Sequence, residues 1–153
     1  MDEKVFDGLN LNEFCQQQHN DVLDKGFDNF HIPTLLMLTV TELSEACEAD
    51  RKKRHTDFAA FDEEMPQAIR SMADDAVIWR TKDGHVISDI EMVKARFKHA
   101  FEKHVKDTFE DEIADAFLRL MDLCGAYGID IERHIQMKAY YNKLRPTKHG
   151  KEY

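Results

Sequence analysis

The chain has 153 residues, of which 42% are hydrophobic and 33% charged, and a formal net charge of −9. This hydrophobic content excludes a wholly disordered chain, and the length predicts a single domain. The negative charge argues against general nucleic-acid binding, and no apolar run approaches the roughly 20 residues that a membrane span needs. Three widely spaced cysteines and the lack of a charged-then-apolar leader favour a cytoplasmic protein without a disulfide scaffold.

Hydrophobic residues recur with helical periodicity over most of the chain. The first predicted helix covers about 10–25 and ends at Gly26. The second covers about 33–53, with Pro33 in its first turn, where the missing N–H costs nothing. The spacing of its apolar residues predicts a core-facing seam of Leu36, Val40, Leu43 and Cys47.

Residues 57–107 have a different pattern. A short helix, which Pro66 interrupts, is indicated by Phe58, Phe61, Met65, Ile69 and Met72. Two β-prone runs, 76–80 and 85–88, flank an Asp-Gly pair that is typical of a β-hairpin. Ser88 and Glu91 then form a capping-box pattern. The helix that follows carries on one face Ile90, Val93, Phe97, Ala100 and Phe101.

Another helix is predicted from Thr108 to about Ala126, either continuous with the preceding helix or separate from it. Its expected inward residues are Phe109, Ile113, Ala116, Leu120 and Cys124. Asp130 is expected to cap the last helix, which ends near Leu144. The chain is therefore predicted to be all-α. We expect a four-helix-bundle-like domain over 1–153, with a hairpin-plus-helix insertion at 57–107 between the second and third main helices.

Two pairs of acidic residues have a spacing that suits metal binding. Glu42 and Glu45 are three residues apart, as are Glu112 and Asp115, so each pair shares one helix face. Each pair alone fits a solvated helix surface, since charged residues are mostly exposed. Together, on two helices of one bundle, they predict a cluster of carboxylates that repel one another unless cations lie between them. All-oxygen ligation suits Mg²⁺ or Mn²⁺.

The last predicted helix carries a polar and basic face. His134, Lys138, Asn142 and Arg145 recur at helical spacing, with Tyr141 beside them. Residues 133–153 sum to a charge of +5, which leaves −14 for the rest of the chain. Such a face can bind a polyphosphate, or it can be a solvated surface that balances the acidic body.

Several segments resemble the MazG-like nucleotide pyrophosphohydrolases. Residues 38–46 (LTVTELSEA) resemble the first motif of that family, and residues 109–116 (FEDEIADA) resemble the second. Residues 138–146 (KAYYNKLRP), followed by 148–150 (KHG), are similar to the C-terminal segment, and 24–27 (DKGF) also fits. The likeness covers about 1–55 and 108–153.

The resemblance implies an all-α bundle that assembles as a homodimer or homotetramer. It implies Mg²⁺-dependent hydrolysis of nucleoside triphosphates, including dNTPs or non-standard NTPs, to the monophosphate and pyrophosphate. It assigns the metal to Glu42, Glu45, Glu112 and Asp115, with Glu45 or Glu42 also positioning the attacking water. It assigns the substrate to Lys138, Asn142, Arg145 and Tyr141, and to Lys25, Phe27 and His19 near a phosphate and the base.

The long segment between the two acidic motifs departs from the family pattern. The family pattern assigns no role to 57–107. The alternatives for this segment are a lid, an oligomer contact and a specificity element. Relatives that prefer a pyrimidine deoxynucleotide carry a Trp soon after the first motif, whereas 46–54 has none. Trp79 either substitutes for it or packs in a core. The alternatives are a narrow dUTP or dCTP pyrophosphatase, a phosphoribosyl-nucleotide pyrophosphohydrolase, and a catalytically silent bundle that binds nucleotide or protein.

Overall fold

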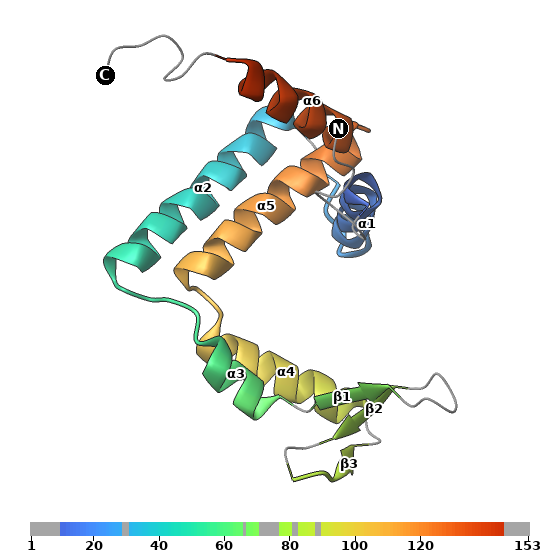
Figure 1. Ribbon diagram of the computed structural model, residues 1–153, viewed down its shortest axis with the longest axis vertical. Coiled ribbons are helices and arrows are strands. Elements are labelled where there is room, and N and C mark those ends of the chain that lie inside the picture. Colours follow the sequence, from blue (N-terminus) through green and yellow to red (C-terminus); the bar gives the residue numbers. More distant parts are fainter. Residues whose placement is uncertain are drawn as a thin grey trace. The chain divides into compact units, whose positions relative to one another are not determined.

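The computed structural model describes residues 10–28, 31–65, 67–70, 77–80, 83–87 and 90–145. Within these ranges the chain is predominantly helical, as predicted (Figure 1). The helices are α1 (Leu11–Asp24), α2 (Ile32–Arg51), α3 (Phe58–Glu64), α4 (Ile90–His104), α5 (Phe109–Ala126) and α6 (Ile131–Leu144). The strands are β1 (Gln67–Arg70), β2 (Val77–Arg80) and β3 (Val86–Ile87).

The chain forms two compact units. Unit 1 consists of Met1–Val40 and Ala116–Tyr153, and unit 2 consists of Thr41–Asp115. Helices α2 and α5 therefore contribute to both units, because each contains a unit boundary. Unit 2 holds the whole predicted insertion and all four acidic residues of the expected metal site.

In unit 1, polar side chains fix the ends of α1 and α6. Asn10 caps α1 by accepting from the backbone N–H of Glu13 at 3.1 Å, and Gly26 follows the helix with a φ of +86°. Asp130 caps α6, as predicted, and also accepts from the Asn12 amide at 2.8 Å. The Asn12 side chain in turn accepts from the backbone N–H of Glu132 at 3.3 Å. These bonds tie the start of α1 to the start of α6.

A close approach of α1 and α5 forms part of the core of unit 1. Cys15 on α1 and Cys124 on α5 are both buried. A Cβ at Gly125 would lie 2.3 Å from the Cys15 carbonyl oxygen and 2.8 Å from His19 Cβ. Position 125 therefore requires glycine for steric reasons, since no side chain fits between the two helices.

In unit 2, the start of the segment that follows α2 lies next to the end of α4. The backbone N–H of Asp57, just before α3, donates to the carbonyl of His104, the last residue of α4, at 3.1 Å. Between these ends α3 packs on α4 (Figure 1), and the ring of Phe61 meets the ring of Phe97 edge-on with centroids 5.8 Å apart. Phe97 stacks on Phe101 at the same centroid distance.

The strands of the insertion form a small antiparallel sheet in the order β1-β2-β3. The predicted hairpin is confirmed, because β2 pairs with β3 and brings Arg80 opposite Val86. Gly84 in the connection has a φ of +85°, which explains the Asp-Gly pair. The helical interpretation of Ile69 is wrong, because this residue lies in β1 and pairs with Ile78. Met72, Ala76 and Ser88 lie outside the described residues.

The predicted seam of α2 is wrong. All four of its residues are exposed: Leu36, Val40, Leu43 and Cys47. The buried stripe consists instead of Leu35, Thr39, Glu42, Ala46 and Ala49. Periodicity could not choose between these two stripes because α2 has apolar residues on most of its surface. Thr39 is tolerated in the buried stripe because its hydroxyl donates to the Leu35 carbonyl at 3.1 Å.

Helices α4 and α5 are separate. Residues 105–107 form a turn between them, and Asp107 has a φ of +58°. On α5, Ala116 and Cys124 are buried as predicted, whereas Leu120 is exposed, which corrects its expected inward position. Phe117, also on α5, is 58% exposed, so part of the apolar surface of this helix is accessible.

Candidate metal centre

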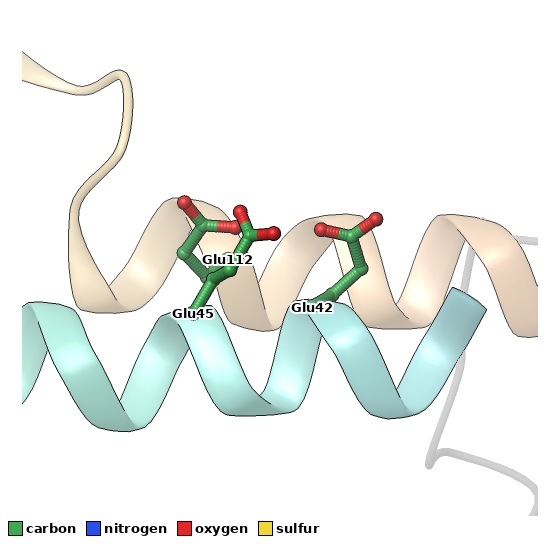
Figure 2. A group of neighbouring side chains, drawn as sticks. All are labelled: Glu42, Glu45 and Glu112. Atoms are coloured by element: carbon green, nitrogen blue, oxygen red, sulfur yellow. The ribbon is translucent and has the colours of Figure 1, made fainter. Parts of the chain in front are cut away.

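Glu42 and Glu45 project from successive turns of α2. Both carboxylates lie near the Glu112 carboxylate of α5, and all three are on the same side of the two helices (Figure 2). Glu42 is buried at 7% exposure, and Glu45 is exposed. The adjacent buried residues on this stripe, Ala46 and Ala49, are small. The site therefore has one carboxylate set into the protein and one that solvent or a ligand can reach.

Glu112 completes the group from the first turns of α5. It is 5% exposed, and one carboxylate oxygen from each of Glu42, Glu45 and Glu112 lies within 4.8 Å of the others. Three oxygens from two helices at this spacing fit the ligand set of a hard divalent cation such as Mg²⁺ or Mn²⁺. Glu42, Glu45 and Glu112 are therefore chemically suited to bind Mg²⁺ or Mn²⁺.

The electrostatics of the site are dominated by burial and like charge. Burial is the largest cause that raises the pKa of the Glu112 carboxyl. The charges of Glu45, Glu42, Asp111 and Asp115 raise the pKa of Glu112 further, in that order. A buried carboxylate among other carboxylates is costly to ionise, and a bound cation offsets that cost.

Asp115, the fourth expected ligand, lies one turn beyond Glu112 on α5. It is exposed and is not part of the group of three. Its charge nevertheless raises the pKa of Glu112, so it belongs to the same electrostatic environment.

The segment after α2 holds the start of α5 in place. The backbone N–H of Phe109 donates to the Arg54 carbonyl at 3.0 Å. Glu110 accepts from the Thr56 N–H at 3.0 Å and contacts His55 Nδ1 at 3.0 Å. These contacts fix the turn of α5 that precedes Glu112 relative to the end of α2, and so they fix the spacing of the acidic residues.

Hydroxyl groups reinforce the same junction. The hydroxyls of Thr56 and Thr108 are 2.7 Å apart, and Thr108 donates to the Val105 carbonyl at 2.6 Å. Asp111 accepts from the N–H of Asp107 at 3.0 Å, while its own N–H donates to the Thr108 hydroxyl at 3.4 Å. The Thr108 hydroxyl thus caps the first turn of α5, and the Asp111 carboxylate holds the residue before Thr108.

The expected phosphate-binding residues lie on α6 in unit 1. Lys138, Tyr141 and Asn142 are exposed on the helix, and Arg145 is its C-cap. The Lys138 ammonium lies 5.1 Å from the centroid of the Tyr141 ring, a cation–π distance. The helical spacing predicted for this face is thus present, and the cationic groups are accessible.

Lys25, Phe27 and His19 also belong to unit 1. Lys25 is the C-cap of α1, and Phe27 is 65% exposed. His19 lies on α1 with its Nδ1 2.9 Å from a carboxylate oxygen of Asp122 on α5. Sequence reasoning missed Asp122, which is buried at 7% exposure. The only signal for it was an acid two residues before Cys124, on the inward side of an amphipathic helix.

Trp79, considered as a replacement for a base-pocket tryptophan, is in β2 and pairs with Ile87. Its side chain lies outside the described part of the structure.

None of the helices in the described ranges has the length and apolar character needed to span a membrane. Comparison of the chain with protein-family models, curated proteins and solved structures gives no match.

Proposed function

We propose that the protein is a Mg²⁺-dependent nucleoside triphosphate pyrophosphohydrolase that produces a nucleoside monophosphate and pyrophosphate. The observation that carries the proposal is the convergence of Glu42, Glu45 and Glu112 from two helices, with carboxylate oxygens within 4.8 Å of one another. Two of the three are buried, an arrangement with a high electrostatic cost and a clear use in cation binding. The MazG-like bundle is the fold that this function implies.

In this proposal Mg²⁺, or Mn²⁺ in its place, is held by Glu42, Glu45, Glu112 and Asp115. When bound, it supplies positive charge for the phosphate oxygens and lowers the pKa of a coordinated water. Glu45 is the exposed carboxylate and orients the attacking water, from which it accepts a proton. The water oxygen bonds to the α-phosphorus, the bond to the bridging oxygen breaks, and pyrophosphate leaves.

Substrate binding is assigned to the cationic face of α6 and to the end of α1. Lys138 and Arg145 offset the charge of the leaving pyrophosphate, Asn142 and Tyr141 bind the sugar, and Lys25 binds a phosphate. Phe27 and His19 contact the base. The assembly is a homodimer or homotetramer, in which a second copy covers exposed apolar residues of α2 such as Leu36, Met37 and Val40.

The test is pyrophosphate release from a panel of canonical and modified NTPs and dNTPs, with Mg²⁺ and with EDTA. Glu45→Gln is expected to lose at least about 100-fold of the turnover. Glu48→Gln is the matched control. It makes the same change one turn away, at a residue that pairs with Arg51 and Lys52 outside the cluster, and it is expected to keep full activity.

The outcomes separate the candidate functions. Mg²⁺-dependent release with a monophosphate product supports the proposal, and a preference for dUTP or dCTP narrows it to a pyrimidine deoxynucleotide pyrophosphatase. Unchanged turnover in Glu45→Gln would contradict the assigned role of the cluster. Mg²⁺ and nucleotide binding without turnover of any substrate would favour the silent binding module.

A further inference from the structure

Two of the three cysteines are buried in unit 1 and line the same pocket. Cys15 is 2% exposed and Cys124 is 7% exposed. The two thiols are close enough for each to shift the pKa of the other. The steric requirement for glycine at Gly125 keeps the two residues close, because it lets α5 lie directly against the backbone of Cys15. The fold thus holds two sulfurs together although 108 residues separate them in the sequence.

A pocket gives access to the pair. Its volume is about 220 Å³, and both Cys15 and Cys124 line it, beside Gln16 and Gly125. A small polar oxidant such as hydrogen peroxide is far smaller than this volume. The two residues are therefore buried from bulk solvent and still border a space that a small reagent can enter.

We propose that Cys15 and Cys124 form a site of reversible oxidation, at which a hydroperoxide converts the two thiols into an intramolecular disulfide between α1 and α5. This inference does not depend on the proposed catalytic function. In the first step the Cys15 thiolate attacks one peroxide oxygen, so that an S–O bond forms, the O–O bond breaks and hydroxide leaves. The sulfur loses two electrons to the peroxide.

In the second step the Cys124 sulfur attacks the sulfenic sulfur of Cys15. An S–S bond forms, the S–O bond breaks, and the hydroxyl leaves with the Cys124 proton as water. Cys15 reacts first because Cys124 lowers the pKa of Cys15, whereas Cys15 raises the pKa of Cys124. Burial raises the pKa of both thiols, so the first step is slow at neutral pH and faster in mild base.

Peptide mapping tests the proposal directly. Trypsin releases Cys15 within residues 5–25, Cys47 within 26–51 and Cys124 within 120–133, so each cysteine is in its own peptide. The full chain is treated with hydrogen peroxide, unfolded with an alkylating reagent present, digested and analysed by mass spectrometry. The expected product is a 5–25/120–133 pair joined by a disulfide, which dithiothreitol separates.

Cys47→Ser is the control variant. Cys47 is exposed, so its removal eliminates intermolecular disulfides without touching the buried pair. Oxidation of Cys47→Ser is expected to produce the same linked peptides and a rise in Tm of about 5–10 °C that dithiothreitol reverses. The proposal would be overturned if, in the natural chain, Cys47 were completely oxidised while Cys15 and Cys124 were still recovered as alkylated thiols. A link that involves only Cys47, or sulfinic acids without a link, would overturn it equally.

Discussion

Replacement of Glu112 by Gln is expected to stabilise the metal-free protein and to abolish stabilisation by Mg²⁺. The change keeps the size of the side chain and removes one negative charge from the buried end of the cluster. The oxygens of this group lie within 4.8 Å of one another, and two unit charges at that distance repel by about 3.5 kcal/mol at an effective dielectric constant of about 20. Relaxation and partial protonation reduce this energy, so we expect the free energy of unfolding to rise by about 1–3 kcal/mol in EDTA.

The stabilisation expected from Glu112→Gln depends on pH. Burial and neighbouring carboxylates raise the pKa of Glu112 above its ordinary value of 4.5. A raised carboxyl pKa means that the folded protein binds the proton more tightly than the unfolded chain does. The metal-free protein is therefore favoured below the ordinary pKa and loses that stability as the pH rises through the raised pKa. Above the raised pKa the penalty is complete, and Glu112→Gln removes it.

Thermal unfolding at about pH 8 measures the effect, because 1 kcal/mol corresponds to about 2–4 °C in Tm for a chain of this length. In EDTA the Tm of Glu112→Gln is expected to exceed that of the natural protein by about 3–10 °C. Magnesium at about 100 times its dissociation constant adds about 2.7 kcal/mol to the natural protein and almost nothing to the variant. The difference in Tm between the two proteins therefore falls to about zero or changes sign when EDTA is replaced by Mg²⁺.

Glu48→Gln serves as the control here as well, since Glu48 lies on α2 one turn beyond Glu45 and pairs with Arg51 outside the cluster. It is expected to leave both Tm values and the Mg²⁺ shift nearly unchanged. A Glu112→Gln protein that is less stable in EDTA, or one that gains the same Mg²⁺ shift as the natural protein, would refute the reasoning.

Two further predictions concern unit 1. Gly125→Ala is expected to destabilise the protein by about 2–3 kcal/mol or more, because the new Cβ would lie 2.3 Å from the Cys15 carbonyl oxygen. Gly84→Ala, where no atom is within 4 Å of the added Cβ, is expected to cost only about 1 kcal/mol through its positive φ; equal costs in urea unfolding would disprove the steric argument. Asp130→Ala is expected to lower Tm by about 3–6 °C, because α6 loses its cap and Asn12 loses its acceptor. Asp130→Asn keeps an acceptor oxygen and should recover most of that loss in a thermal scan.

Local signals made the ends of the elements predictable. Asn10 and Asp130 cap their helices as their side-chain chemistry suggests, and Gly26 and Gly84 adopt the positive φ that turns need. Each of these effects acts within a few residues, so the sequence contains all of the relevant information. The overall helical character and the hairpin were predictable for the same reason.

Tertiary choices were less predictable. On α2 the sequence offers Leu36 and Val40 as a good apolar stripe, yet the buried side is the one that carries Thr39 and Glu42. That choice depends on which surface meets α5, and periodicity in one helix contains no such information. The acidic group was predictable because two i, i+3 pairs on separate helices have a common chemical use. Asp122 was not, because its partner His19 is 103 residues away.

The hydrogen bond between Asp57 and His104 has a consequence for how this chain accommodates a long insertion. A segment that leaves and re-enters a fold at adjacent backbone positions adds little loop-closure entropy, since that cost grows only with the logarithm of its length. Because the bond and the Thr56–Thr108 contact close the segment at its base, its length and content can change through evolution while Glu45 and Glu112 keep their separation. The segment between Asp57 and His104 is thus a closed unit of its own, and Glu45 and Glu112 lie outside it.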